Sequence, residues 1–290
     1  MVLVQLNGGL GNQLFQYALG RKIALDRNTV PRFETSAFRT QSREYKLHHY
    51  QVKGSPATEK EVRRFLGWEQ NPWLKKVYRL YNSKRPYYRR VIVDEQSVPF
   101  DKNILKVPKN VFLRGYWQSE KYFHDIAEIL RQDLVLKTPL SGLNREMAKK
   151  IQTSLSVSLH VRHGDYATDM ATHQTHGLLS LDYYRAAISH ILALFPDASF
   201  FLFSDDIPWI RENLKINATH CYVDHNTDQT DFEDLRLMSL CKHHIIANSS
   251  FSWWGAWLCQ NPEKVVVAPR QWYRIEIDTR DLVPKDWIRL

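Results

Sequence analysis

The sequence predicts an α/β fold of two Rossmann-like halves, each built around a parallel, doubly wound sheet. The chain opens with a short apolar strand, a glycine-rich loop and a helix-spaced run of apolar residues. Its second half alternates apolar, β-branched runs with segments of helical periodicity. Turn-forming residues at 137–142 separate the halves, and 290 residues suffice for two domains. We therefore expect domains at residues 1–141 and 142–290.

The first half begins with a β-α-β unit. Residues 2–6 are apolar and β-branched, as in a buried strand, and the loop at 7–11 contains three glycines. Phe15, Leu19 and Ile23 then recur at helical spacing. The other elements expected in this half are strands at 29–33 and 111–117 and a helix at 119–130 capped by Ser119.

Residues 59–90 form a basic, aromatic insertion in the first half, with helical spacing at 59–66 and 73–81. Lysines and arginines are set among tryptophans and tyrosines, and acidic residues are few. The interpretation we favour is a solvated helical insertion whose aromatic side chains pack inward. The alternative is a surface for an anionic acceptor or for membrane headgroups.

The second half repeats the alternation of strand and helix more clearly. In parallel sheets of this kind, ligands bind at the carboxyl ends of the strands, so residues that follow a strand are candidates for a site. Strands are expected at 157–161, 199–203, near Cys221, at 244–247 and at 265–268, and helices at 182–195, 208–214, 231–241 and 251–259.

Charge and cysteine content bound the partners and the compartment. A formal net charge of +9 and a pI near 9.4 predict an anionic partner, a class that includes nucleic acid, anionic lipid and a nucleotide-bearing substrate. No apolar run approaches the ~20 residues of a membrane-spanning helix, and the N-terminus lacks a basic leader. The three cysteines lack paired spacing, as is typical of buried free thiols. We expect a cytoplasmic protein, with peripheral contact at the inner membrane left open for residues 59–90.

Ionisable residues gather where the strand at 157–161 ends: His160, Arg162, His163 and Asp165. Side chains alternate along a strand, so His160 and Arg162 share one face. A guanidinium in this position can hold a phosphate through two parallel hydrogen bonds. The simpler alternative is an Arg–Asp pair that stabilises the turn, but the position at a strand end favours a ligand site.

Two further strand ends carry polar residues. Ser249, Ser250 and Phe251 open a helix whose first N–H groups can bind phosphate, although an ordinary N-cap has the same composition. Asp205 and Asp206 lack the spacing and the third ligand of a metal site, so a helix cap or a ribose contact is expected instead. No metal and no cofactor is predicted.

The glycine loop, which includes Gly9 and Gly11, resembles a dinucleotide fingerprint only in part. Leu14 occupies the position of the third glycine, which disfavours an NAD-linked enzyme. No sequence pattern of a known RNA- or DNA-binding module is visible either, which disfavours a nucleic-acid-binding protein.

Three motifs in order give the chain a resemblance to a known family. They are GGLGNQLFQYA at residues 8–18, HVRHGDY at 160–166, and DFEDL at 231–235 leading into NSSFSWW at 248–254. Their order and spacing, and the length of the chain, resemble the α-1,2-fucosyltransferases of glycosyltransferase family 11, particularly the bacterial members. The resemblance covers nearly the whole chain.

The resemblance implies two facing domains of the GT-B type and an inverting transfer that needs no metal. Fucose would move from GDP-β-L-fucose to the 2-hydroxyl of a galactose-type residue on an oligosaccharide or a lipid-linked glycan. The C-terminal half would hold GDP-fucose and the N-terminal half the acceptor. By the broader relationship to α-1,6- and protein O-fucosyltransferases, His160 and Asp234 would contact guanine or ribose.

The same relationship implies that Arg162 holds the β-phosphate beside Ser249 and Ser250, and that Asn12 faces the reacting centre. The family often has a second arginine where this chain has His163, a departure that bears on phosphate affinity. The general base stays open, since Asp165 and His163 are near in sequence but the base can also come from the N-terminal half. The expected catalytic residues are Asn12, Arg162 and Asp165, and the expected donor-binding residues are Gly9, Gly11, His160, Arg162, His163, Asp205, Asp234, Ser249, Ser250 and Phe251.

Two alternatives remain beside this expectation. One is a fucosyltransferase of another linkage, α-1,6 or to protein, and the other is a non-enzymatic nucleic-acid-binding protein. The sequence leaves the natural acceptor open among an O-antigen repeat, a free oligosaccharide and a host-like glycan, and it leaves the oligomeric state open as well.

Overall fold

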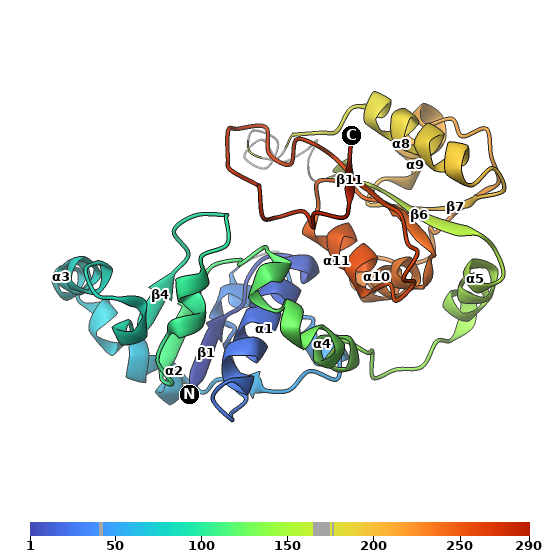
Figure 1. Ribbon diagram of the computed structural model, residues 1–290. Coiled ribbons are helices and arrows are strands. Elements are labelled where there is room, and N and C mark those ends of the chain that lie inside the picture. Colours follow the sequence, from blue (N-terminus) through green and yellow to red (C-terminus); the bar gives the residue numbers. More distant parts are fainter. Residues whose placement is uncertain (41–42, 165–174, 176) are drawn as a thin grey trace. The chain divides into compact units, whose positions relative to one another are not determined.

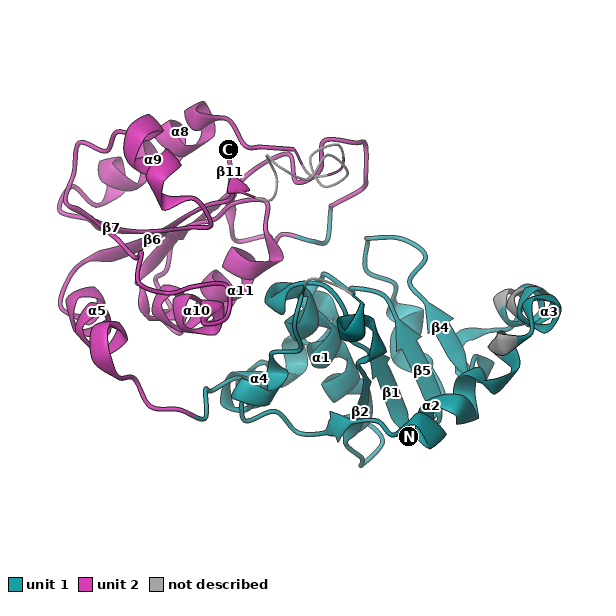
Figure 2. Cartoon of the chain, turned by 180° about the vertical axis from the view of Figure 1, so that it is seen from behind, with its two compact units in different colours: residues 1–137, 280–282 teal, residues 138–279, 283–290 magenta. Residues whose placement is uncertain are grey.

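The structure is a computed structural model that describes residues 1–40, 43–164, 175 and 177–290 (Figure 1). The chain divides into two compact units, shown in separate colours in Figure 2. Unit 1 comprises Met1–Lys137 with Arg280–Leu282, and unit 2 comprises Thr138–Thr279 with Val283–Leu290. The sequence analysis had placed the division four residues later, after residue 141.

Five parallel strands form the sheet of unit 1, in the order β3-β2-β1-β5-β4. The central strand β1 lies between β2 and β5, so the order of the strands reverses between β1 and β5. Leu3 of β1 and Phe112 of β5 are fully buried and pack with Ile92 and Phe65. The strands are β1 (Val2–Gln5), β2 (Pro31–Glu34), β3 (Ser55–Pro56), β4 (Ile92–Asp94) and β5 (Val111–Arg114).

Helix α1 (Leu10–Leu25) follows β1 through the predicted glycine loop and is buried along most of its length. Gly8 has a φ of 73°, in the left-handed region that favours glycine. A Cβ at Gly20 would lie 2.4 Å from Cγ2 of Val4, so this glycine allows α1 to pack directly on the sheet. The predicted β-α-β start of the chain is therefore confirmed.

The predicted helices at 59–66 and 73–81 are present as α2 (Glu59–Leu66) and α3 (Pro72–Ser83). Thr58 begins α2 with a capping box, and the Asn71 side chain caps α3. The two short strands β3 and β4 were not anticipated. The remaining helical elements of unit 1 are the 3₁₀ turns Ser36–Arg39, Leu47–His49, Gly67–Gln70, Tyr87–Arg89, Lys102–Lys106, Glu120–Tyr122 and His124–Ile126, and helix α4 (Ala127–Asp133).

The predicted continuous helix at 119–130 is wrong. Ser119 does cap, but only the 3₁₀ turn Glu120–Tyr122, and α4 begins at Ala127. Phe123 interrupts the helix, with φ −145° and ψ 10°, because its fully buried side chain packs against Phe15 of α1. The strand predicted at 111–117 also ends early, at Arg114, and Trp117 has a φ of 59°.

Six parallel strands form the sheet of unit 2, in the order β11-β10-β9-β6-β7-β8. Read from β8, this is the strand order of a six-stranded Rossmann sheet, and it reverses between β6 and β9. The strands are β6 (Ser156–Val161), β7 (Ser199–Ser204), β8 (His220–Tyr222), β9 (His243–Ile245), β10 (Val266–Ala268) and β11 (Ile288–Arg289).

The helices of unit 2 cover this sheet and were mostly anticipated. Fully buried apolar residues of the strands, such as Leu159, Leu202 and Val267, form the core with α8 and α9. Trp253 and Trp254 of α11 are also fully buried. In the described part of unit 2 the helices are α5 (Gly142–Gln152), α8 (Leu181–Leu194), α9 (Ile207–Asn213), α10 (Asp231–Leu240) and α11 (Ser250–Leu258). Helix α5 and strand β11 were not predicted.

Two sequence expectations about compartment can be compared with the structure. Among the described residues, no helix is both long enough and apolar enough to cross a bilayer. Cys241 and Cys259 are buried free thiols, as expected, whereas the free thiol of Cys221 is only half-buried.

Candidate functional site

The end of β6 and the end of β7 meet through Arg162 and Asp205. The register of the two strands places Val161 opposite Ser204, so the next residue of each strand lies side by side. Arg162 Nε lies 3.4 Å from Asp205 Oδ2, and the backbone N–H of His163 donates to Asp205 Oδ1 at 2.9 Å. Burial raises the pKa of Asp205, but the Arg162 charge and the backbone N–H groups outweigh burial and hold it below its usual value.

The turn after β6 depends on a glycine at position 164. A Cβ there would lie 2.9 Å from Asp205 Oδ2 and 3.3 Å from the Asp205 carbonyl oxygen. Glycine therefore lets the turn close over the carboxylate that orients Arg162. An Arg–Asp pair, which sequence analysis offered as the simpler alternative, is present between Arg162 and Asp205.

His163 is held by the start of α9. Its Nδ1 lies 2.9 Å from Asp206 Oδ2, and its ring stacks on Trp209 with centroids 4.0 Å apart. The other carboxylate oxygen of Asp206 accepts the Trp209 N–H and caps α9, which is the role predicted for this acidic pair. His163, at the position where the family often has a second arginine, is thus engaged in contacts with the start of α9.

His160 is buried beside the first turn of α11, with its ring centroid 5.7 Å from that of Phe251. Burial, reinforced by the nearby Arg162 charge, lowers the pKa of His160 to about 3. The imidazole is therefore neutral at physiological pH, so it can donate or accept hydrogen bonds and pack against a ligand but carries no charge. Its Nδ1 has no hydrogen-bond partner among the described residues.

The start of α11 lies next to the end of β6, because β9 is the neighbour of β6 in the sheet. Ser249 is the N-cap and its side chain accepts the Phe251 N–H at 3.3 Å. Asn248 donates to the carbonyl oxygens of Gly177 and Trp272, which fixes the loop that leads into the helix. The point where the strand order reverses thus brings together Arg162 and the positive end of α11.

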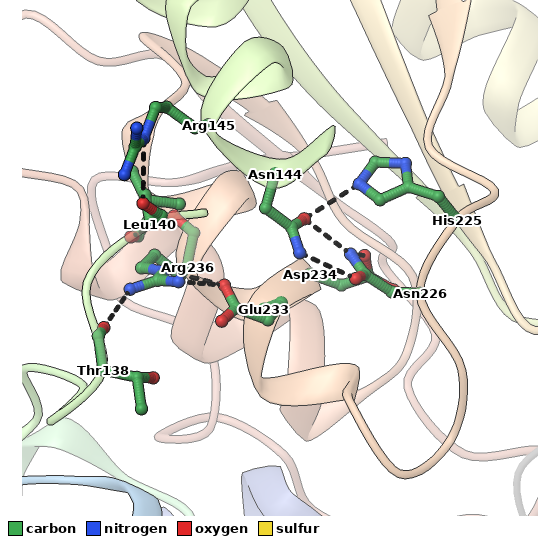
Figure 3. Close-up of polar contacts among 10 residues, drawn as sticks. Thr138, Leu140, Asn144, Arg145, His225, Asn226, Glu233, Asp234 and Arg236 are labelled. Carbon is green, nitrogen blue, oxygen red and sulfur yellow. Dashed lines mark hydrogen bonds and ion pairs between the residues drawn. The ribbon is translucent and has the colours of Figure 1, made fainter. Parts of the chain in front are cut away.

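Asp234 lies in the first turn of α10 within a network of amide side chains (Figure 3). Asn226 Nδ2 donates to Asp234 Oδ1 at 2.6 Å, and Asn226 is paired in turn with Asn144 of α5. His225 Nε2 lies 2.9 Å from Asn144 Oδ1. Burial, together with the negative charges of Asp231 and Glu233, raises the pKa of Asp234 to about 7.

In unit 1, Asn12 and the glycine loop lie at the carboxyl edge of the sheet. Asn12 Oδ1 accepts a hydrogen bond from Gln118 Nε2 at 2.8 Å. A Cβ built at Gly9 would have no heavy atom of the described residues within 4 Å. Gly11 is buried in the first turn of α1. Asn12, Gly9 and Gly11 thus belong to a different unit from the cluster around Arg162.

Asp165, the remaining predicted catalytic residue, lies outside the described residues. Within the described part of the chain, no three His, Cys, Asp or Glu side chains form a cluster of the kind that binds a metal ion.

Several polar residues at these edges were missed by sequence analysis. Glu95 follows β4, and its carboxylate accepts the backbone N–H groups of Tyr116 and Trp117 at 2.7 and 2.9 Å. Burial raises its pKa, although both hydrogen bonds oppose the shift. Because β4 itself was not anticipated, no strand end directed attention to Glu95. Asn144 and Asn226 carried no motif at all.

Comparison with known proteins shows to which family the chain belongs. The sequence model of glycosyl transferase family 11 matches residues 1–290, the whole chain. The chain belongs to glycosyl transferase family 11. It is therefore a glycosyltransferase, and neither an NAD-linked enzyme nor a non-enzymatic nucleic-acid-binding protein is supported.

Two bacterial relatives of this family 11 glycosyltransferase match over nearly their full length. It is 32% identical to an α-1,2-colitosyltransferase of Escherichia coli, over 100% of this chain and 99% of that protein. It is 31% identical to the O-antigen biosynthesis glycosyltransferase WbnK of Escherichia coli, over 98% and 99%. A galactoside 2-α-L-fucosyltransferase of Bos taurus is 26% identical over 51% of this chain and 42% of that protein.

Solved structures support the predicted fold class. An α-1,6-fucosyltransferase, NodZ, soaked with GDP-fucose aligns with a TM-score of 0.55 at 14% identity, over 89% of this chain and 91% of that one. The Arabidopsis thaliana protein FUT1 in complex with GDP aligns with a TM-score of 0.52 at 12% identity, over 91% and 69%. With the two parallel sheets, these likenesses confirm the predicted two-domain α/β fold of the GT-B type.

Proposed function

We propose that this glycosyltransferase transfers L-fucose from GDP-β-L-fucose to the 2-hydroxyl of a galactose-type residue, with inversion and without a metal ion. Its relatives include a galactoside 2-α-L-fucosyltransferase, an α-1,2-colitosyltransferase and an O-antigen glycosyltransferase. An O-antigen or similar glycan is accordingly the acceptor class we propose, with unit 2 as the donor domain and unit 1 as the acceptor domain.

The observation that carries the donor assignment is that Arg162 and the start of α11 follow two neighbouring strands, β6 and β9, at the carboxyl edge of the unit 2 sheet. As the bond to the sugar breaks, GDP gains negative charge and the sugar becomes oxocarbenium-like. A fixed guanidinium and oriented N–H groups can stabilise that charge. Asp205 holds Arg162 in place, and Ser249 caps α11, the helix that follows the neighbouring strand β9.

The nucleoside half of GDP is proposed to lie near Asp234 and His160. Asp234 keeps one oxygen on Asn226, so the other can accept a hydrogen bond from a ribose hydroxyl or a guanine N–H. His160, neutral and buried, lies beside Phe251 at the base of the same region. His163, held on Asp206 and Trp209, is proposed to shape the loop after Arg162 rather than to add a second phosphate contact.

An inverting displacement needs a base on the acceptor hydroxyl. Asp165 remains a candidate from the sequence. Glu95 is a weaker one, because both of its oxygens already accept backbone N–H groups and it thereby fixes the loop next to Gln118 and Asn12. We propose that this loop and Asn12 position the acceptor.

A second candidate donor is GDP-colitose. It is favoured by the 32% identity to a relative named as a colitosyltransferase. Colitose lacks the 3-hydroxyl of fucose. A site that hydrogen-bonds a substrate hydroxyl typically rejects the analogue without it by a factor of about 10⁴. The two donors can therefore be distinguished directly in competition.

The test is a transfer assay with GDP-fucose or GDP-colitose and lactose, with and without EDTA, followed by mass spectrometry and linkage analysis. An α-1,2-fucosylated product that persists in EDTA is the expected result. Product from GDP-colitose alone would mean that the donor is GDP-colitose, and a different linkage would mean that another acceptor hydroxyl is used. Activity that disappears in EDTA and returns with added Mg²⁺ or Mn²⁺ would overturn the metal-independent mechanism.

A further inference from the structure

Helix α3 carries an apolar stripe that faces solvent. Trp73, Val77 and Leu80 recur at helical spacing, with 70%, 46% and 62% of their surface exposed. Leu74 and Tyr81 lie beside them at 42% and 58%. Aromatic side chains of the insertion were expected to pack inward, and for Trp73, Tyr81 and Tyr88 that expectation is wrong.

The opposite side of α3 packs against the rest of unit 1, and these contacts hold the stripe facing outward. The Tyr78 ring lies 3.7 Å from that of Trp68, and both pack on the core cluster around Ile92 and Phe65. The buried Asn82 donates to the carbonyl oxygen of Ile92 at 2.7 Å. Both views place α3 beside β4, the edge strand of the sheet, at the margin of unit 1 (Figures 1 and 2).

The stripe lies in the most basic part of the chain. Residues 71–93 contain seven lysines and arginines and no acidic residue. Arg85 lies over the Tyr81 ring at 5.1 Å and Arg89 over the Tyr88 ring at 5.5 Å. Lys76 is exposed on α3, and Lys84 is exposed at its C-terminal end. Cations thus contact exposed aromatic rings of this segment and accompany the apolar stripe along α3.

We infer that the α3 surface, residues 71–91, binds the face of an anionic lipid bilayer. An amphipathic helix with tryptophan and leucine on one side and lysine and arginine beside them lies in the plane of the bilayer interface. Tryptophan and tyrosine prefer the depth of the headgroups, and lysine can reach anionic headgroups while its stem stays apolar. The surface has each of these parts.

Charge argues against a second copy of this chain as the occupant. Pairing two copies through this stripe would bring two sets of seven positive charges together, with no acid in the segment to offset them. Anionic headgroups complement the same charges. The inference does not depend on the donor or the linkage proposed above, because it concerns only the outer surface of unit 1.

The expected binding is moderate and depends on both the cations and the apolar stripe. Each lysine or arginine near an anionic leaflet contributes about five-fold in affinity, and this contribution decreases as salt screens it. The double variant Lys76→Glu/Lys84→Glu should therefore lower binding by more than about 25-fold, since it also adds repulsive charges. Trp73→Ser/Leu80→Ser should lower it by a similar factor through lost apolar burial.

The experiment is flotation of the full chain with vesicles of phosphatidylcholine alone, or of phosphatidylcholine with about one third phosphatidylglycerol. The control Lys149→Glu/Lys150→Glu makes the same charge change at exposed lysines of α5 in unit 2. An unchanged melting temperature shows that each variant is folded. We expect flotation only with phosphatidylglycerol, lost in both α3 variants and kept in the control.

Three results would overturn the inference. The first is no flotation with either vesicle. The second is equal loss in the α5 control, which would mean that net charge alone drives binding. The third is a dimer of the wild-type chain in sedimentation analysis that Trp73→Ser/Leu80→Ser converts to monomer, which would make a second copy the occupant of the stripe.

Discussion

The carboxyl edges of the two sheets are built from different side chains. The edge of unit 2 has the ionisable residues Arg162, Asp205 and Asp234. Arg162 pairs with Asp205, whose pKa is lowered, and the pKa of Asp234 is raised. At the edge of unit 1 the glycine loop is held by neutral amides, with Gln16 bonded to Asn7 and to the Gly115 carbonyl oxygen, and Gln118 bonded to Asn12. The carboxylate at this edge, Glu95, accepts two backbone N–H groups of the neighbouring loop.

This difference fits two different ligands. A nucleoside diphosphate is recognised by fixed charges and oriented N–H groups. Sugar hydroxyls both donate and accept, as amide side chains do, and amides do not titrate. The comparison therefore predicts that changes in unit 2 alter donor use and its pH dependence, whereas changes in unit 1 alter the acceptor or the stability of the loop.

The largest effect is expected for Arg162→Ala. Loss of the group that stabilises charge on the leaving GDP should lower kcat by roughly 10²–10³-fold. Steady-state release of GDP measures it. Arg185→Ala, on the exposed surface of α8, is the matched control and should keep full activity. Full activity in Arg162→Ala would remove the phosphate assignment.

Asp234→Asn tests the nucleoside assignment and its dependence on pH. The raised pKa means that folding favours protonated Asp234, so its stabilising contribution is complete below about 4 and is lost as pH rises through about 7. The ionised form is the better acceptor for GDP. Wild-type affinity for GDP should therefore rise through about pH 7, while the variant is more stable at pH 8 and binds GDP about 10- to 100-fold more weakly there.

Calorimetry with GDP and thermal unfolding at pH 5.5 and pH 8 measure the two effects. Asp182→Asn, at an exposed position of α8, is the control. Opposite signs for stability and affinity would mark Asp234 as a binding residue. Unchanged GDP affinity at pH 8 would leave it as a structural carboxyl only.

Gln16→Leu probes the amide edge of unit 1. The buried side chain satisfies the Asn7 backbone N–H and the Gly115 carbonyl oxygen, so the variant leaves both unpaired. The free energy of unfolding should fall by about 2 kcal/mol in urea titration. Gln96→Leu, at an exposed position, should change it by less than about 0.5 kcal/mol. Equal stability of the two variants would show that the edge does not depend on this amide.

The smallest effect is expected for Asn12→Ala. Loss of one neutral hydrogen bond, about 1 kcal/mol, should raise the KM for the acceptor about five-fold and leave the KM for GDP-fucose unchanged. Initial rates with each substrate varied in turn distinguish the two constants. A rise in the donor KM instead would assign Asn12 to the donor.

The sequence predicted the parts of the molecule in which local pattern and function coincide. Alternation of strand and helix located β6, β7 and β9, and the rule that ligands bind at strand ends directed attention to Arg162 and Ser249. Contacts between distant residues could not be predicted in the same way. The partner of Arg162 is Asp205, 43 positions on, because β6 and β7 are neighbours in the sheet.

Where tertiary packing overrides local pattern, the sequence was misleading. Ser119 is followed by helix-forming residues, but burial of Phe123 against Phe15 breaks that helix. Tryptophan is usually buried, but Trp73 faces outward because Asn82 anchors the opposite side of α3.

We propose that unit 2 binds the diphosphate of GDP through Arg162 and the start of α11 without a metal ion. The most direct measurement is calorimetric titration of GDP into the wild-type chain and into Arg162→Ala, both in EDTA. We expect the wild type to bind GDP in EDTA and the variant to bind it at least about ten-fold more weakly. Binding that requires added Mg²⁺ or Mn²⁺, or equal affinity in the two proteins, would contradict it.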